Sequence, residues 1–159
     1  MLEATKARKR AYKLIIFDWE GTLAKGGNTL IEGVKDLLEL LVTKNFTCAI
    51  ATSMPLSRLQ DSIMENELQS YFSHLQAADC GANKPDPKML LELLHHLSFR
   101  ADEAVMIGDS IYDLIMAQKA QVDAIGVLSG SDTKEHLLTA APQAILETVN
   151  DLSTYLNLV

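Results

Sequence analysis

The 159-residue chain has few cysteines, few prolines and glycines, and no long apolar run. Its two cysteines, Cys48 and Cys80, have no CxxC or Cys/His spacing, which excludes disulfide-rich scaffolds and structural zinc sites. Eight glycines and four prolines exclude collagen-like and low-complexity classes. A membrane-spanning helix needs roughly 18 consecutive apolar residues, and no run comes near that length, so we expect no membrane span.

The composition is that of a folded chain. Hydrophobic residues make up 48% and charged residues 22%, and 17.5 kDa suits one domain over residues 1–159. Only Leu14-Ile15-Ile16-Phe17 separates the basic N-terminal residues from Asp18, which is too short for the apolar part of a signal peptide. We therefore expect a reduced, cytoplasmic protein.

Charge is unevenly distributed along the chain. The first 13 residues carry five Lys or Arg and one Glu, whereas the net charge of the whole chain is −7. Residues 1–12 form a basic N-terminal arm that can contact phosphates or anionic lipid, although a solvated segment before the first strand is the simpler interpretation. Because the rest of the chain is acidic, it lacks the clustered positive charge of a nucleic-acid interface, and we expect no nucleic-acid partner.

Short apolar runs alternate with helical patterns. We expect strands at 12–18, 46–52, 75–79, 103–109 and 123–128. Between and after them we expect helices at 29–45, 55–65, 86–97, 110–120, 132–139 and 150–156. This alternation, without hairpin turn signals, predicts an α/β fold: a Rossmann-like three-layer sandwich with a parallel sheet of about five strands.

Polar residues stand where the predicted strands end. Asp18, Thr52 and Asp109 close the first, second and fourth strands, and Lys84 follows soon after the third. In an open parallel sheet, ligands bind at the carboxyl ends of the strands, so these four side chains are expected to meet at one edge. Each alone has a structural explanation, such as helix capping for Asp109 or a surface position for Lys84.

Together these residue types indicate phosphoryl transfer. Asp18 and Asp109 can hold Mg²⁺, which takes one or two carboxylates together with waters and phosphate oxygens. Thr52 and Lys84 can bind the remaining phosphate oxygens and stabilise the charge that develops during transfer. An Asp carboxylate is also a competent nucleophile that can form an aspartyl-phosphate intermediate.

Four segments carry a family resemblance. They are Phe17–Leu23 (FDWEGTL), Ala51-Thr52, Lys84–Pro87 (KPDP) and Gly108–Asp113 (GDSIYD). In this order they resemble the motifs of the haloacid dehalogenase (HAD) superfamily, and most closely its phosphoglycolate phosphatase-like branch. The match runs from about Leu14 to Leu128. It implies a sheet with strand order 5-4-1-2-3 and a Mg²⁺-dependent phosphomonoester hydrolase.

The resemblance also implies roles for single residues. Asp18 would be the nucleophile, and Thr52 and Lys84 would hold the phosphoryl group. Asp18 and Asp109 would bind Mg²⁺, Asp113 would bind it or support its ligands, and the backbone carbonyl of Glu20 would supply another metal contact. The partner would be a phosphorylated substrate, either a small molecule or a macromolecule.

Glu20 departs from the family pattern, which usually has Asp two residues after the nucleophile as acid and base. Glu20 offers the same carboxyl group on a longer arm, so we expect it to act in catalysis with altered efficiency. Two alternatives stay open. One is a catalytically weak or inactive module that binds phosphate or a partner. The other is a phospho-accepting switch on Asp18, as in receiver domains, although the FDWEGT and GDSIYD motifs favour a member of the HAD superfamily over a receiver domain.

A cap domain is also missing from the pattern. Only 34 positions separate Asp18 from Thr52, where residues 24–28 leave room for a short loop, and 32 separate Thr52 from Lys84. Relatives with a helical cap use it to enclose the substrate, as lids generally do. We therefore expect an open site, suited to a large substrate or covered by a second subunit in a homo-oligomer.

Overall fold

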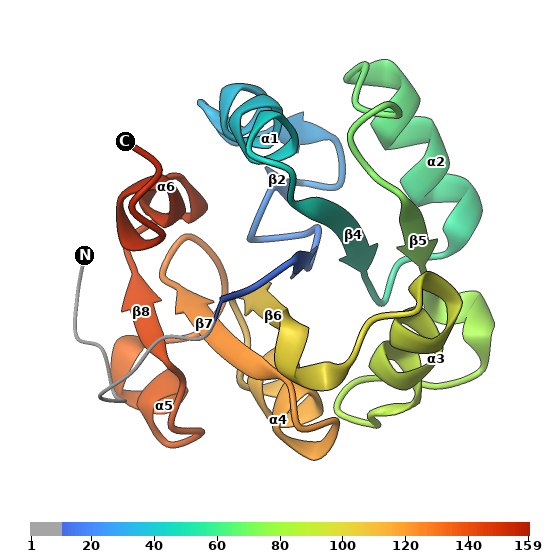
Figure 1. Cartoon of the computed structure of the whole chain (residues 1–159). Helices are drawn as coiled ribbons and strands as arrows, with labels where there is room; N and C mark the ends of the chain where they lie inside the picture. The colour runs from blue at the N-terminus through green and yellow to red at the C-terminus, as the bar shows by residue number, and fades with distance from the viewer. Residues whose placement is uncertain (1–10) are drawn as a thin grey trace.

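A computed structural model describes residues 11–159, so most of the basic N-terminal arm predicted at 1–12 lies outside the described residues. The main sheet consists of β1 Leu14–Phe17, β4 Thr47–Ala51, β5 His74–Gln76, β6 Ala104–Gly108, β7 Asp123–Val127 and β8 Ala144–Leu146. All six strands are parallel, in the order β5-β4-β1-β6-β7-β8 (Figure 1). The α/β fold and the expected order of its five strands are confirmed.

The sheet has one strand more than predicted. β8, with the sequence AIL, pairs with β7 and forms one edge of the sheet. Three residues are too few to show a periodicity, which is why the sequence pattern missed this strand. The strand expected at 75–79 is also shorter than predicted, because Ala78–Cys80 forms a 3-10 turn instead.

Helices cover both faces of the sheet, which confirms the three layers. α1 Val34–Thr43, α2 Leu56–Glu65 and α6 Leu152–Tyr155 pack on one face. α3 Lys88–Leu97, α4 Ile111–Lys119 and α5 Lys134–Leu138 pack on the other (Figure 1). Alternate residues of β1 divide between the two faces: Ile15 and Phe17 belong to the first core, and Leu14 and Ile16 to the second.

The segment before α1 is a hairpin rather than the predicted loop and early helix. β2 Ala24–Lys25 pairs antiparallel with β3 Thr29–Leu30 across a tight loop in which Gly26 and Gly27 have positive φ. Gly33, at φ 88, separates this hairpin from α1, so the helix begins at Val34 and not at residue 29. The hairpin was not predicted because two-residue strands are too short to show an alternating pattern. The helix was expected to begin early because Leu30 has the same spacing as the apolar residues of α1.

The described chain from Asp18 to Lys84 holds no inserted domain. Between β1 and β4 lie only the hairpin and α1, and between β4 and β5 only α2 and its flanking turns. The expected absence of a cap at these two places is therefore confirmed. Within residues 11–159, no helix has the length and apolar character needed to cross a membrane.

Two neighbouring residues of α1 test the packing against the sheet. Leu41 is fully buried in the first core, whereas Val42 is 41% exposed. Leu41→Ala should lower the free energy of unfolding by about 2–5 kcal/mol, because it leaves a cavity. Val42→Ala should change it by about 0.5 kcal/mol or less. Urea unfolding followed by circular dichroism measures both, and equal losses in the two variants would contradict this packing.

Candidate active site

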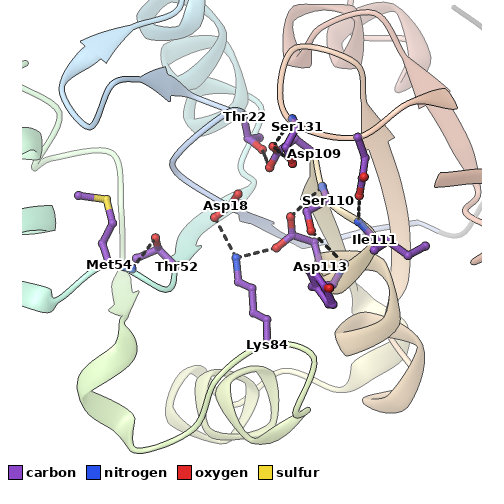
Figure 2. A network of polar contacts seen from close by, with 12 residues as sticks. Asp18, Thr22, Thr52, Met54, Lys84, Asp109, Ser110, Ile111, Asp113 and Ser131 are labelled. Carbon is purple, nitrogen blue, oxygen red and sulfur yellow. Dashed lines mark hydrogen bonds and ion pairs between the residues drawn. The ribbon is translucent and has the colours of Figure 1, made fainter. Parts of the chain in front are cut away.

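The carboxyl edge of the sheet brings together the side chains that were expected there. Asp18 follows β1, Thr52 follows β4 and Asp109 follows β6, while Lys84 lies in the loop between β5 and α3. These strands are in register, with Phe17 opposite both Ile50 and Ile107. The four side chains line a single cavity of about 510 Å³ (Figure 2).

An ion-pair triad occupies the floor of this cavity. The Nζ atom of Lys84 lies 2.8 Å from Asp18 Oδ1 and 2.6 Å from Asp113 Oδ1 (Figure 2). Asp113 comes from the first turn of α4, and its Oδ1 accepts no hydrogen bond of good geometry, so its contact with Lys84 is ionic. One ammonium therefore stands between two buried carboxylates.

Burial sets the protonation of the triad. It raises the pKa of Asp18 well above its usual value, and the charge of Asp113 raises it further, while Lys84 acts in the opposite direction. Burial likewise raises the pKa of Asp113 despite Lys84. Burial alone would lower the pKa of Lys84, but the charges of Asp113 and Asp18 outweigh it and raise that pKa. The lysine is thus charged, and the site is short of positive charge.

Asp109 is held by the loop after β7. Its Oδ2 accepts hydrogen bonds from Ser131 N at 2.9 Å and Ser131 Oγ at 3.2 Å (Figure 2). Thr22 Oγ1 lies 3.5 Å from Oδ1 on the opposite side. The backbone of Gly21 and Gly130 approaches the carboxyl group so closely that a Cβ atom at either position would collide with it. These contacts fix the direction of the carboxylate.

Three carboxylates converge on one point. Ligand atoms of Asp18, Asp109 and Asp113, all buried, lie within 4.8 Å of one another. Carboxylate oxygens are the ligands that Mg²⁺ prefers, and a divalent cation would supply the positive charge that Lys84 alone does not. The donor set therefore fits Mg²⁺. The side chain of Glu20 is not part of this cluster.

Glu20 faces the hairpin. Its Oε2 accepts a hydrogen bond from Gly26 N at 2.9 Å, and its Oε1 accepts one from Gly27 N at 2.6 Å. The side chain is exposed and lines the cavity, so it lies at the site, but both of its oxygens are engaged by the loop. Any proton transfer by Glu20 requires one of these bonds to break.

Thr52 lies across the cavity from Asp109. Its side chain is 2% exposed, and its Oγ1 accepts a hydrogen bond from Met54 N at 3.2 Å (Figure 2). Because this bond uses an acceptor lone pair, the hydroxyl hydrogen stays available to a ligand oxygen. Ser110 is the residue that caps α4, accepting from Tyr112 N at 3.0 Å, so capping does not account for Asp109.

Comparison with known proteins agrees with this geometry. The haloacid dehalogenase-like hydrolase family matches residues 3–127. The chain belongs to this family. It is 33% identical over 151 residues to the probable phosphatase IndB of Dickeya dadantii, a match that covers 94% of this chain and 65% of that protein. It is 30% identical over 126 residues to the phosphoglycolate phosphatase of Colwellia psychrerythraea, covering 79% of this chain and 56% of that protein.

A solved structure shares the fold of this haloacid dehalogenase-like chain. The predicted phosphoglycolate phosphatase from Haemophilus somnus superposes with a TM-score of 0.82 at 16% identity, covering 93% of this chain and 99% of the other. At that identity the likeness concerns the fold. The chain spans about two thirds or less of the length of the two curated relatives that it matches.

Gly130 and Ser131 also belong to the site, although the motifs in the sequence did not indicate them. They follow β7, the fifth predicted strand, in the segment Ser129–Asp132 (SGSD). The rule that places ligand-binding residues at the carboxyl ends of strands applies to this strand as well, and it would have indicated the loop. What no pattern could indicate is that Gly130 is needed for the close approach of Asp109.

The raised pKa of Asp18 leads to a stability prediction. Between its ordinary pKa and the raised pKa of the folded state, Asp18 is ionised in the unfolded chain but protonated in the folded chain. The free energy of unfolding therefore falls as the pH rises through this window up to the raised pKa. Without divalent cations, Asp18→Asn should therefore raise the urea midpoint at pH 7. The gain should shrink as the pH falls toward 4. Asp61→Asn, which removes an exposed charge, is the control; an equal gain there would contradict a local origin.

Proposed function

We propose that this chain is a Mg²⁺-dependent phosphomonoester hydrolase that acts through an aspartyl-phosphate on Asp18. The observation that carries the proposal is the buried Asp18 carboxylate, 2.8 Å from Lys84 and within the carboxylate cluster, at the floor of an open cavity. Relatives named as phosphatases support it. The substrate is a phosphorylated molecule, and the free thiols Cys48 and Cys80 support a reducing, cytoplasmic setting.

The reaction proceeds in two steps. An oxygen of Asp18 attacks phosphorus, the bond from phosphorus to the ester oxygen breaks, and Glu20 donates a proton to that departing oxygen. Water then attacks the aspartyl-phosphate, Glu20 takes its proton, and inorganic phosphate leaves with Asp18 restored. Lys84 and Thr52 bind the phosphoryl oxygens through both steps.

Mg²⁺ would be held by Asp18, Asp109 and Asp113, with the backbone carbonyl of Glu20 as a further ligand. When bound, it offsets negative charge on the phosphoryl group and on the carboxylates. The chain's own contribution is to hold the carboxylates in place, through Ser131 on Asp109 and through Lys84 between Asp18 and Asp113.

A second function stays open because of one observation. Both oxygens of Glu20 are bonded to hairpin amides, at 2.9 and 2.6 Å. If Glu20 never leaves the hairpin, the proposed proton transfers have no donor. The site would then bind Mg²⁺ and phosphate with little turnover, as a binding module.

The hydrolase proposal predicts Asp18-dependent release of phosphate. With 4-nitrophenyl phosphate and Mg²⁺, the wild type should release nitrophenolate, and Asp18→Asn should lose at least about 10³-fold of this activity because no covalent intermediate can form. Removal of Mg²⁺ with EDTA should have a comparable effect. Thermal unfolding with and without Mg²⁺ shows that the variant is folded. Equal activity in both proteins would refute the mechanism.

Glu20 is tested by two substitutions. Glu20→Gln keeps an acceptor for the hairpin but cannot transfer a proton, so turnover of an alkyl phosphate, whose leaving group needs a proton, should fall about 10²- to 10⁴-fold. Glu20→Asp should keep or raise turnover. A nitrophenolate leaving group needs no proton, so the first step with 4-nitrophenyl phosphate should suffer less in Glu20→Gln. Unchanged turnover of the alkyl phosphate in Glu20→Gln would instead assign Glu20 to the hairpin alone.

A further inference from the structure

The β2–β3 hairpin and α2 together form one wall of the cavity. Ser62 Oγ donates a hydrogen bond to Gly27 O at 2.7 Å, and Trp19 Nε1 donates to the same carbonyl at 3.0 Å. One helical turn farther on, Glu65 Oε2 accepts a hydrogen bond from Asn28 Nδ2 at 2.6 Å. The hairpin loop is thus fixed along one face of α2.

Arg58 lies on the same face of α2. It precedes Ser62 by four residues, the spacing that places two side chains on one side of a helix. Its guanidinium lies against the hairpin loop, since a Cβ atom on Gly27 would be 3.3 Å from Arg58 Nη2. Arg58 also lines the cavity that contains Asp18 and Lys84.

The guanidinium of Arg58 has no anionic partner. Among residues 11–159 it makes no hydrogen bond and no ion pair, although the chain as a whole is acidic. Arg100, the other described arginine, pairs with both Asp102 and Glu103. In the same cavity, Lys84 is already engaged by two carboxylates. Arg58 is therefore the cation in this cavity that stays available to a ligand.

Its position indicates which part of a ligand it would meet. Glu20, the proposed proton donor to the leaving group, binds the amide of Gly27, and Arg58 lies against the same glycine. Arg58 is thus on the leaving-group side of the cavity, whereas Thr52 and Lys84 serve the phosphoryl group. The half-buried Met54 and the 57% exposed Tyr112 add apolar surface to the cavity lining.

We infer that Arg58 is a specificity-determining residue that binds a second anionic group, carried by the leaving group of the substrate. The inference rests on the proposed hydrolase function and narrows its substrate to phosphomonoesters with a second anion. A carboxylate and a second phosphate both match the planar fork of a guanidinium, which binds either through two parallel hydrogen bonds. Phosphomonoesters whose leaving group is uncharged would be bound only through their phosphoryl group, by Thr52 and Lys84.

Matched substrates test the second anion. 3-Carboxyphenyl phosphate and 3-carbamoylphenyl phosphate have nearly the same shape and differ in one charge. The wild type should show a kcat/KM at least about tenfold higher for the carboxylate, the scale of a hydrogen bond between charged groups. Arg58→Gln should abolish this preference while leaving kcat/KM for the amide unchanged, and Arg58→Lys should keep part of it.

Further arms of the experiment separate the sources of the effect. Propane-1,3-diyl bisphosphate beside 3-hydroxypropyl phosphate tests a second phosphate in place of a carboxylate. Lys119→Gln, an exposed substitution at the far end of α4, removes one positive charge from the protein and should leave both preferences intact. Loss of preference in this control would show that net charge, and not Arg58, selects the substrate.

Binding separates this inference from the hydrolase proposal. In the Asp18→Asn background, calorimetric titration with 3-carboxyphenyl phosphate should show affinity falling at least about tenfold on Arg58→Gln, with no change for the amide. Hydrolysis that depends on Asp18 but shows no preference for either anion would overturn the role of Arg58 and leave the hydrolase standing. Absence of hydrolysis with an Arg58-dependent affinity would overturn the hydrolase and keep the anion subsite. Equal affinities in the titration would overturn the subsite.

Discussion

The site depends on one buried ammonium placed between two buried carboxylates. Removing three charges from water is costly, and Lys84 offsets part of that cost by contacting Asp18 and Asp113 at once. The triad ties the end of β1 to the start of α4 and to the loop before α3. With Asp109 added, three carboxylates face one lysine. Burial is the main cause of the raised pKa values of Asp18 and Asp113, and the neighbouring carboxylates add to it. The surplus of negative charge also explains why the site fits a divalent cation.

Much of this site could be predicted because its residues stand at the ends of buried strands. An apolar run such as Leu14–Phe17 is recognisable on its own, and the residue after it lies at the sheet edge whatever the rest of the chain does. Strand order came from the family resemblance. β8 and the β2–β3 hairpin could not be predicted, since strands of two or three residues have no period and depend on tertiary pairing.

The contacts of Glu20 could not be predicted from the sequence for a different reason. They depend on a loop in which Gly26 and Gly27 take positive φ and turn both amides toward one carboxylate. A carboxyl group two residues after Asp18 is visible in the sequence; whether it points to the substrate or to a loop is decided by backbone dihedrals. The extra methylene of Glu relative to Asp gives the reach for the second arrangement. Proton transfer to a substrate and hydrogen bonding to the hairpin amides thus require the same two carboxylate oxygens of Glu20.

Within the described residues, a ligand at this site can be contacted only by the lining of the cavity. The described chain between Asp18 and Lys84 has no inserted domain, and the cavity is lined by residues of the core alone. Lys84 is already paired with both Asp18 and Asp113, which leaves it little capacity to recognise a second anionic group. Arg58, in the first turn of α2, is different: its guanidinium lies against Gly27 of the hairpin loop and has no ionic partner among residues 11–159. A guanidinium without an internal partner keeps its N–H donors for a ligand, and its planar fork matches a carboxylate or a phosphate, so it can discriminate between substrates by their charge.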